Sequence, residues 1–292
     1  MPKYNYELAG IDMQMIMPFQ MKISRESYYF VKEGSSENYN KTKEEKLDIS
    51  FQSTDALPEL PSNGIWIEDT YYTILNGKQT MFYRNHFSKP PYAMVIEEDD
   101  KICCKYIDNK ENIFLHTSDI LNHIGIEALL LNHSAFLLHA SLIRQEDKAI
   151  LFTAPCGTGK STQAELWAKY KDSDILNGDR AALRCQDGQW RAYGMPFAGT
   201  SRIYRNESAP VAAVVVLEQG QKNEIRKLSG REALGRLLPE CSCRRWDADF
   251  MGQMADLLIR LLDEIPIYLL SCLPDEDAVE LLYTTLKKDE RL

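Results

Sequence analysis

An apolar run, a turn with two glycines and an amphipathic run follow one another without interruption in residues 148–171. Residues 148–153 (KAILFT) are apolar enough for a buried strand, and residues 161–171 space their apolar side chains as on one face of a helix. The turn between them, residues 154–162, has the sequence APCGTGKST. A strand, a turn and a helix in this order predict an α/β domain built around this connection.

The turn contains the residue types of a phosphate-binding P-loop. Backbone N–H groups around Gly157 and Gly159 can surround phosphate oxygens. The Lys160 ammonium can reach the outer phosphates, and the Ser161 hydroxyl can take one position on Mg²⁺. Ala154 stands where the usual pattern has its first glycine, so the pattern is met in a relaxed form. We expect ATP and Mg²⁺ to bind here, with these nucleotide-binding residues: Ala154, Pro155, Cys156, Gly157, Thr158, Gly159, Lys160, Ser161 and Thr162.

Length and composition narrow the class of protein. The 292 residues are enough for one large α/β domain and a smaller one, and 44% are hydrophobic, which predicts a buried core. The formal net charge of −9, without a run of Lys and Arg, argues against nucleic acid as a partner. The seven cysteines include no CxxC pair, so reduced thiols are expected. The sequence shows no signal peptide and no apolar stretch of transmembrane length, so we expect a cytoplasmic protein with no membrane partner. The sequence leaves open whether the protein forms a homo-oligomer.

Residues 1–116 differ from the rest of the chain. Short β-prone runs alternate there with charged turns that contain Gly or Asn, and no chemical motif stands out. We expect a smaller β-rich domain, accessory or involved in substrate recognition, in residues 1–116, and the P-loop catalytic domain in residues 117–292. The β-prone runs are residues 28–31, 65–67, 71–75, 80–83, 93–96 and 102–107.

Helical and strand patterns alternate in residues 117–292. Residues 118–133 predict one helix capped by Ser118, and the apolar run 211–217 (VAAVVVL) predicts an inner strand covered on both faces. Acidic residues after Pro274 predict the start of a last helix that ends near residue 287. The remaining predicted strands are 135–143, 148–153, 174–178, 190–193 and 267–270, and the remaining predicted helices are 161–171, 230–238 and 248–263.

Two polar residues outside the turn are candidates for chemistry. His139 interrupts the apolar strand 135–143 just upstream of the P-loop strand; alone, it would more often be a hydrogen-bonded core histidine. Asp179 follows the short strand 174–178, where its carboxylate could meet Mg²⁺ directly or through water. The plain alternative for Asp179 is an aspartate in a surface turn.

Four motifs in order, HAS, APCGTGKST, LNGDR and AYGMPF, resemble the C-terminal catalytic domain of HPr kinase/phosphorylase and its relatives. The resemblance is closest to the HPr-kinase-like proteins encoded beside lasso and other ribosomally made peptides, and it covers roughly residues 120–285. That family shares its fold with ATP-dependent phosphoenolpyruvate carboxykinases. The resemblance implies a mixed sheet flanked by helices, and ATP-dependent transfer of the γ-phosphate to a serine hydroxyl of a peptide or protein.

The resemblance also implies roles for single residues. The family's P-loop lysine and serine hold phosphates and Mg²⁺, which carries over to Lys160 and Ser161, and its strand histidine matches His139. Its Asp-Asp pair matches Gly178-Asp179, so only the second acid, the one that helps to bind metal, is present. Asp179, His139 and Lys160 are therefore the expected catalytic residues, and Ser161 and Asp179 the expected metal ligands. The motifs leave open which group accepts the proton of the acceptor hydroxyl. Asp179 and His139 are the candidates, and the alternative is a late proton transfer that needs no strong base.

Three arginines are candidates for holding the acceptor or the leaving phosphates: Arg180, Arg202 and Arg205. For Arg202 and Arg205 the alternative is solvated loop charges. The resemblance favours a backbone turn at Gly194 and Pro196 that brings residues 197–206 toward the site. The long arginine-bearing signature of true HPr enzymes has no good match, so neither HPr specificity nor the phosphorylase reaction carries over.

Three other functions fit parts of the same pattern. A kinase for a small molecule, such as free serine, would share every motif. A regulatory ATPase would use the strand that ends at Glu218, with Glu218 activating water. A non-catalytic nucleotide-binding module would have lost the first acid and would only signal that nucleotide is bound.

Overall fold

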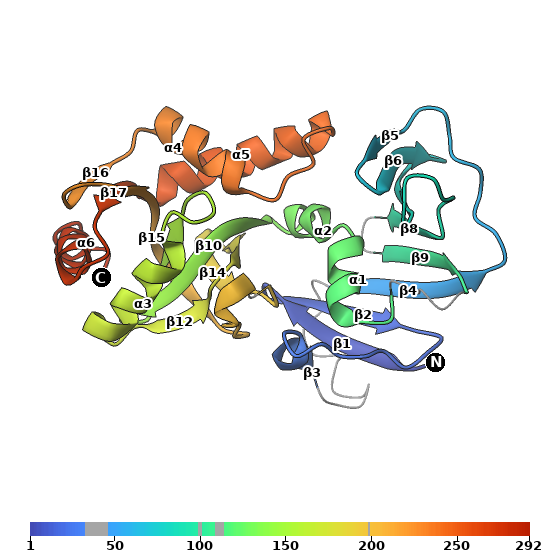
Figure 1. The fold of residues 1–292 in the computed structure, drawn as a ribbon, viewed down its shortest axis with the longest axis horizontal. Helices are drawn as coiled ribbons and strands as arrows, with labels where there is room; N and C mark the ends of the chain where they lie inside the picture. Colours follow the sequence, from blue (N-terminus) through green and yellow to red (C-terminus); the bar gives the residue numbers. More distant parts are fainter. Residues whose placement is uncertain (33–45, 99–100, 109–113, 198) are drawn as a thin grey trace. The chain divides into compact units, whose positions relative to one another are not determined.

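The computed structural model describes residues 1–32, 46–98, 101–108, 114–197 and 199–292, which form two compact units, Met1–Ile126 and Glu127–Leu292 (Figure 1). The division falls inside the region 118–133 that was expected to be one helix. Gly125 has a φ of 68°, a left-handed conformation that ends helices, so the region holds α1 (Thr117–His123) and α2 (Ile126–Asn132). The prediction of one helix capped by Ser118 was therefore wrong.

The N-terminal unit contains a nine-stranded mixed sheet. Its strands β2, β4 and β9 run parallel to one another, and the other neighbours are antiparallel. The predicted strand at residues 28–31 is mostly the 3-10 helix η1 (Tyr28–Phe30). The other five predicted runs are strands. In sheet order the strands are β3 (Val31–Lys32), β1 (Lys3–Leu8), β2 (Ile11–Ile16), β4 (Lys46–Thr54), β9 (Lys101–Ile107), β8 (Ala93–Glu98), β7 (Lys78–Tyr83), β6 (Thr70–Leu75) and β5 (Ile65–Ile67).

The C-terminal unit contains an eight-stranded mixed sheet. On one edge, β10 pairs with β13 as far as His139; on its other edge, it pairs with β11 from Ala140 onward. The strands are β10 (Ala135–Gln145), β11 (Lys148–Thr153), β12 (Asp174–Asn177), β13 (Arg180–Gln186), β14 (Gln189–Gly194), β15 (Ser208–Gln219), β16 (Glu224–Lys227) and β17 (Ile267–Cys272).

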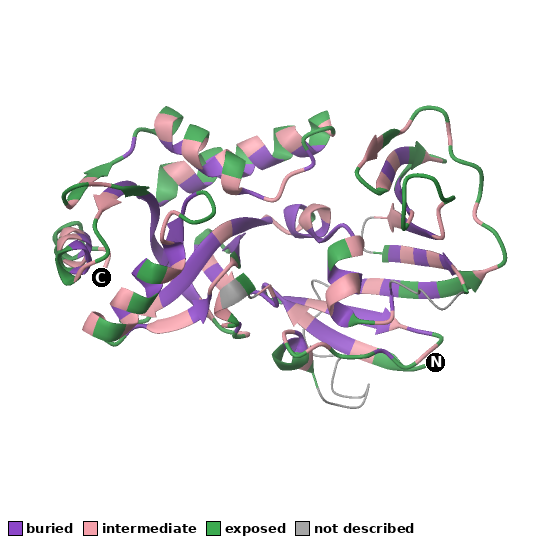
Figure 2. Cartoon of the chain, viewed as in Figure 1, coloured by how far each residue is buried: buried purple, intermediate pink, exposed green. Residues whose placement is uncertain are grey.

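Helices flank this sheet, which confirms the α/β class and the mixed sheet with helices on its sides. Apolar residues of α3 (Lys160–Lys171) and α6 (Glu276–Lys288) pack with one set of strand residues, and those of α4 (Gly230–Leu237) and α5 (Ala248–Glu264) pack with the other. Strands β10, β11 and β15 are buried over most of their length (Figure 2). In β15, Val214 and Val216 join the α4/α5 side while Val215 and Leu217 join the α3/α6 side, as expected for a strand covered on both faces.

All seven cysteines lie in the described residues, and each is a free thiol. In that same part of the chain, no helix combines the length and the hydropathy needed to cross a bilayer.

Candidate functional site

The candidate site lies where β11 and β12 end on either side of β10. Thr153, the last residue of β11, donates its hydroxyl to the His139 carbonyl at 2.9 Å, and the Ala140 amide donates to the Asp179 carbonyl at 2.9 Å. The 154–159 loop and the 178–179 turn therefore leave the sheet beside the same residue, His139. Ligands of α/β proteins usually bind at such carboxyl ends of strands.

The 154–159 loop requires glycine for its backbone conformation. Gly157 has a φ of 79° and Gly159 a φ of 120°, and a Cβ at either position would have no heavy atom within 4 Å. Glycine is therefore favoured at both positions by the positive φ and not by a lack of space.

The start of α3 differs from those of the other long helices. Helices α4, α5 and α6 each begin with a Ser or Asp side chain that accepts backbone N–H groups, namely Ser229, Asp247 and Asp275. Helix α3 begins after Gly159, which has no side chain to cap it. Its first N–H groups are thus left for another acceptor, and with the helix dipole they favour an anion.

The Lys160 side chain folds back over the loop. Its Nζ donates to the Ala154 carbonyl at 2.6 Å and to the Pro155 carbonyl at 3.3 Å, and the residue is only 7% exposed. Burial lowers the pKa of Lys160, while the negative charges of Glu240 and Asp179 act in the opposite direction. The ammonium is thus largely shielded from water, and the negative charges of two carboxylates act on it.

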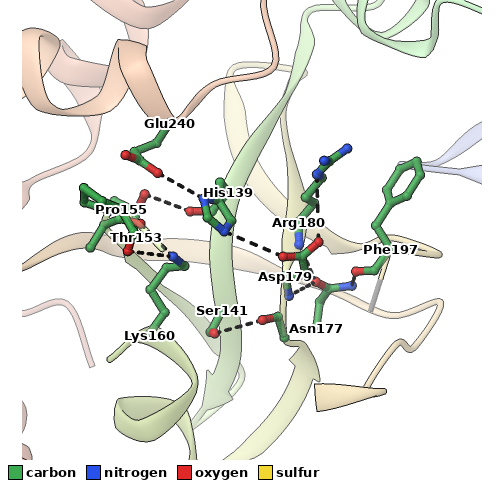
Figure 3. Close-up of polar contacts among 12 residues, drawn as sticks. His139, Ser141, Thr153, Pro155, Lys160, Asn177, Asp179, Arg180, Phe197 and Glu240 are labelled. Carbon is green, nitrogen blue, oxygen red and sulfur yellow. Dashed lines mark hydrogen bonds and ion pairs between the residues drawn. The ribbon is translucent and has the colours of Figure 1, made fainter. Parts of the chain in front are cut away.

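His139 lies between those two carboxylates (Figure 3). Its Nδ1 is 3.1 Å from Oε2 of Glu240, and its Nε2 is 3.6 Å from Oδ1 of Asp179. The side chains of His139 and Asp179 are about one-third exposed, whereas that of Glu240 is 12% exposed. The structure therefore brings together His139, Asp179 and Lys160, which the sequence singled out, and adds Glu240, which it did not.

Glu240 is placed by contacts that no local pattern reveals. It ends the 3-10 helix η3 (Leu238–Glu240), and the next residues run along β10: Cys241 bridges Leu138, and the Ser242 amide donates to the Leu137 carbonyl at 3.0 Å. The sequence shows only an acidic residue before a loop. Its pairing with a histidine 101 residues earlier depends on the tertiary fold.

Asn177 holds the turn that carries Asp179. Its buried side chain donates from Nδ2 to the carbonyls of Met195 (2.7 Å) and Phe197 (3.2 Å). Its Oδ1 accepts the backbone N–H groups of Asp179 and Arg180, both at 2.9 Å. All four bonds need an amide, since only an amide both donates and accepts in this way.

We expect Asn177→Asp to lower the free energy of unfolding by about 3 kcal/mol, because a buried carboxylate oxygen would face two carbonyls that it cannot donate to. Urea denaturation followed by circular dichroism measures this change. Asn132→Asp, at the exposed end of α2, makes the same chemical change in water and should have little effect. Equal denaturation midpoints for the two variants would contradict the assignment of the Asn177 bonds.

Two glycines after β13, Gly194 and Gly199, lie in tightly packed backbone, the second of them beside Asp179. A Cβ at Gly194 would lie 2.1 Å from the Arg205 carbonyl oxygen, so only glycine fits there. Gly199, in the 3-10 helix η2 (Gly199–Ser201), has a φ of 55°, and a Cβ there would lie 3.0 Å from both Cβ and Cγ of Asp179. The loop backbone therefore packs directly on the carboxylate of Asp179.

Gly199→Ala should push the Asp179 carboxylate aside and lower by about 10-fold the rate of any reaction that uses this carboxylate. It should also lower stability by about 1 kcal/mol because of the positive φ. The matched control is Gly188→Ala. Gly188 also has a positive φ (74°), but a Cβ there meets no atom within 4 Å. Thermal denaturation and turnover should show similar stability losses in both variants, with the activity loss confined to Gly199→Ala. An equal activity in both would remove Gly199 from the site.

The three candidate arginines lie in different surroundings. Arg180 Nε is 3.9 Å from Asp179 Oδ2, and its guanidinium lies 5.6 Å from the centre of the Phe197 ring. Arg202 is exposed on the loop. The Arg205 guanidinium is 3.1 Å from Asp174 and 3.8 Å from Glu207 in a surface network of ion pairs. Of these three, Arg180 is the one in contact with another candidate residue.

The oxygen donors present suit Mg²⁺. Ser161 lies in the first turn of α3 and Asp179 ends the turn after β12, so a hydroxyl and a carboxylate are available. In the part of the chain that the structure describes, no three His, Cys, Asp or Glu side chains are arranged to hold a metal by themselves. Hydroxyl and carboxylate oxygens are ligand types that Mg²⁺ accepts in proteins.

The fold and the site together define an α/β protein with two mixed sheets, in which a strand–loop–helix connection adjoins a histidine between two carboxylates. Residues 102–273, more than half of the chain, match the model of the family described as SynChlorMet cassette protein ScmC, and the chain belongs to this family. Among solved structures, the HPr(Ser) kinase/phosphatase from Coxiella burnetii is similar over 53% of this chain and 90% of that chain, with 14% identity and a TM-score of 0.32. No curated protein matches this chain.

Proposed function

We propose that this protein is an ATP-dependent kinase that transfers the γ-phosphate to a hydroxyl group, that of a serine in a peptide or protein. The observation that carries the proposal is the meeting of two features at His139: the 154–162 loop with Lys160 folded over it, and the turn with Asp179. A phosphate-binding loop alone is shared by many functions. A base and a carboxylate beside it are what transfer to a hydroxyl requires.

The loop geometry supports the proposed binding of ATP. The phosphates would accept the N–H groups of the loop and of the uncapped first turn of α3, and the Lys160 ammonium would turn from the loop carbonyls to the outer phosphates. Ser161 and Asp179 would hold Mg²⁺. When bound, Mg²⁺ supplies positive charge that offsets the charge building on the transferred group.

Transfer then needs a place for the acceptor hydroxyl. Nε2 of His139 and Oδ1 of Asp179 are 3.6 Å apart, so one hydroxyl can be within hydrogen-bond distance of both. As its oxygen forms a bond to the γ-phosphorus, the β,γ-bridging P–O bond breaks, its electron pair leaves with ADP, and the hydroxyl proton passes to Asp179 or His139. Arg180, and with it Arg202 and Arg205, would hold the acceptor or the transferred phosphate.

Residues 1–116 are proposed to form an accessory or substrate-recognition domain. The cytoplasm, which supplies ATP and keeps thiols reduced, is the proposed location. The test of the function is incubation with ATP, Mg²⁺ and serine-containing peptides, or with free serine, followed by intact-mass spectrometry. A peptide that gains one phosphoryl group is the expected result. A gain on free serine alone would instead identify a small-molecule kinase, and nucleotide binding without turnover would identify a non-catalytic module.

A regulatory ATPase is the second candidate, because Glu218 lies close to the end of the strand that runs beside β11. Strand β15 runs parallel to β11, and Gln219, the residue after Glu218, donates from Nε2 to the Gly157 carbonyl at 3.5 Å. Glu218 itself is half exposed and lies 4.0 Å from Arg236. ADP release without any phosphorylated acceptor is the result that this function would give.

A further inference from the structure

The imidazole of His139 has unequal contacts with its two carboxylates. The distance from Nδ1 to Glu240, 3.1 Å, is that of a hydrogen bond, whereas the distance from Nε2 to Asp179, 3.6 Å, is too long for one. A neutral imidazole carries one N–H, and the partner of the more tightly bound nitrogen selects which one. This geometry favours the proton on Nδ1, which leaves the lone pair of Nε2 directed toward Asp179.

Glu240 is well placed to hold the ring. Its side chain is 12% exposed, so water competes weakly for its oxygens. The residue after it, Cys241, is buried and bridges β10, so the backbone beside Glu240 is anchored to the same strand that carries His139. A short, anchored contact of this kind fixes a side chain more firmly than an exposed ion pair does.

Glu240 also supplies a second carboxylate in a site where one acid of the expected pair is absent. Gly178 stands before Asp179 and contributes only backbone groups: its carbonyl accepts the Ser141 hydroxyl at 3.3 Å. The second carboxylate comes instead from η3, on the opposite side of the His139 ring (Figure 3). It therefore contacts the imidazole rather than the neighbouring acid.

We propose that Glu240 is a positioning residue for phosphoryl transfer: it accepts the Nδ1–H of His139 and keeps Nε2 turned toward Asp179, where the acceptor hydroxyl binds. This inference rests on the proposed kinase function. Glu240 touches neither ATP nor the acceptor and acts through His139. Its negative charge also acts on Lys160, so a role through Lys160 is the alternative that the experiment must separate.

The kinetic test compares two replacements of similar length. Glu240→Gln keeps an oxygen that accepts Nδ1–H, whereas Glu240→Met fills the same space without one. We expect kcat to fall about 100-fold in Glu240→Met and less than about 10-fold in Glu240→Gln, with KM for ATP unchanged in both. Glu264→Gln, an exposed acid on α5, is the control for the loss of one charge. Equal kcat values in Glu240→Gln and Glu240→Met would overturn the proposal.

A double-mutant cycle separates His139 from Lys160. In a His139→Ala background, Glu240→Met should have no further effect on kcat, because the ring on which Glu240 acts is gone. If Glu240→Met has its full effect in that background and raises the KM for ATP, Glu240 acts through Lys160, and the proposal is overturned.

The ring itself can be observed without nucleotide. ¹⁵N-histidine NMR reports which ring nitrogen carries the proton, and His139→Asn identifies the signal among five histidines. We expect a protonated Nδ1 in the wild type and loss of that preference in Glu240→Met. An unprotonated Nδ1 in the wild type, or no change in the variant, would overturn the proposal. If the wild type transfers no phosphate at all, the kinase function fails, while this measurement still tests the contact.

Discussion

Replacing Lys160 with methionine is expected to lower phosphoryl transfer by about 1,000-fold or more, because the ammonium offsets charge that builds on the transferred phosphate. Methionine has a similar length and can occupy the same buried path over the loop. The measurement is the rate at which ADP and phosphorylated acceptor form. Lys169→Met, on the exposed side of the same helix, is the control and should keep wild-type activity.

The same variant is expected to fold at least as stably as the wild type without nucleotide. Burial lowers the pKa of Lys160 below its ordinary value of 10.5, so the charged form is less favourable in the folded protein than in the unfolded chain. This cost is present in full below the folded pKa and is relieved as the pH rises from the folded pKa toward 10.5, where the unfolded chain binds more protons. As the pH rises over this range, the free energy of unfolding of the wild type should therefore increase relative to that of Lys160→Met. A variant that is less stable and inactive would show that Lys160 mainly supports the loop.

The second large effect is expected for Asp179→Asn compared with Glu218→Gln. Each change keeps the size of the side chain and removes one charge. If Asp179 binds Mg²⁺ and faces the acceptor hydroxyl, its replacement should lower transfer by about 100-fold to 1,000-fold, whereas Glu218→Gln should stay within about 2-fold of the wild type. Intact-mass spectrometry of the acceptor and ADP release measure the two parts of the reaction separately.

The fold should tolerate Asp179→Asn. The contacts that place residue 179 are made by its backbone: its carbonyl accepts the Ala140 amide, and its own amide donates to Asn177. Thermal denaturation of both variants is therefore expected to match the wild type. The reverse kinetic result, loss of ADP release in Glu218→Gln alone, would support the regulatory ATPase and contradict the kinase.

Much of the C-terminal unit could be predicted from sequence, because its elements are buried and strongly patterned. The prediction of residues 148–153 as a strand is confirmed, and α3 begins one residue before the predicted helix. Strand β13 was missed because its alanines have low β-propensity; it is a strand because β10 and β14 pair with it on both edges. Strand β16 was missed because it is short and charged, as sheet-edge strands often are.

The N-terminal unit was harder to predict. Strands β1, β2 and β4 were missed, and the first two alternate apolar with polar or charged residues over only six positions. The aromatic run at residues 28–30 favoured a strand by propensity. The local turn hydrogen bond from the Phe30 amide to the Ser27 carbonyl instead closes a 3-10 helix.

By itself, the sequence determined the loop and the helix that follows it. The glycines, Lys160 and Ser161 are contiguous, and a strand followed by a tight turn leaves their backbone few alternatives. The order of the motifs also predicts His139 and Asp179 as site residues. Only the tertiary structure decided which groups meet at the carboxyl ends of β11 and β12. On one edge of β10 the end of β11 brings the 154–159 loop to His139, and on the other edge the start of β13 brings Asp179. The 241–242 segment brings Glu240 to the same ring. Contacts between residues so far apart depend on strand pairing, which local sequence patterns do not specify.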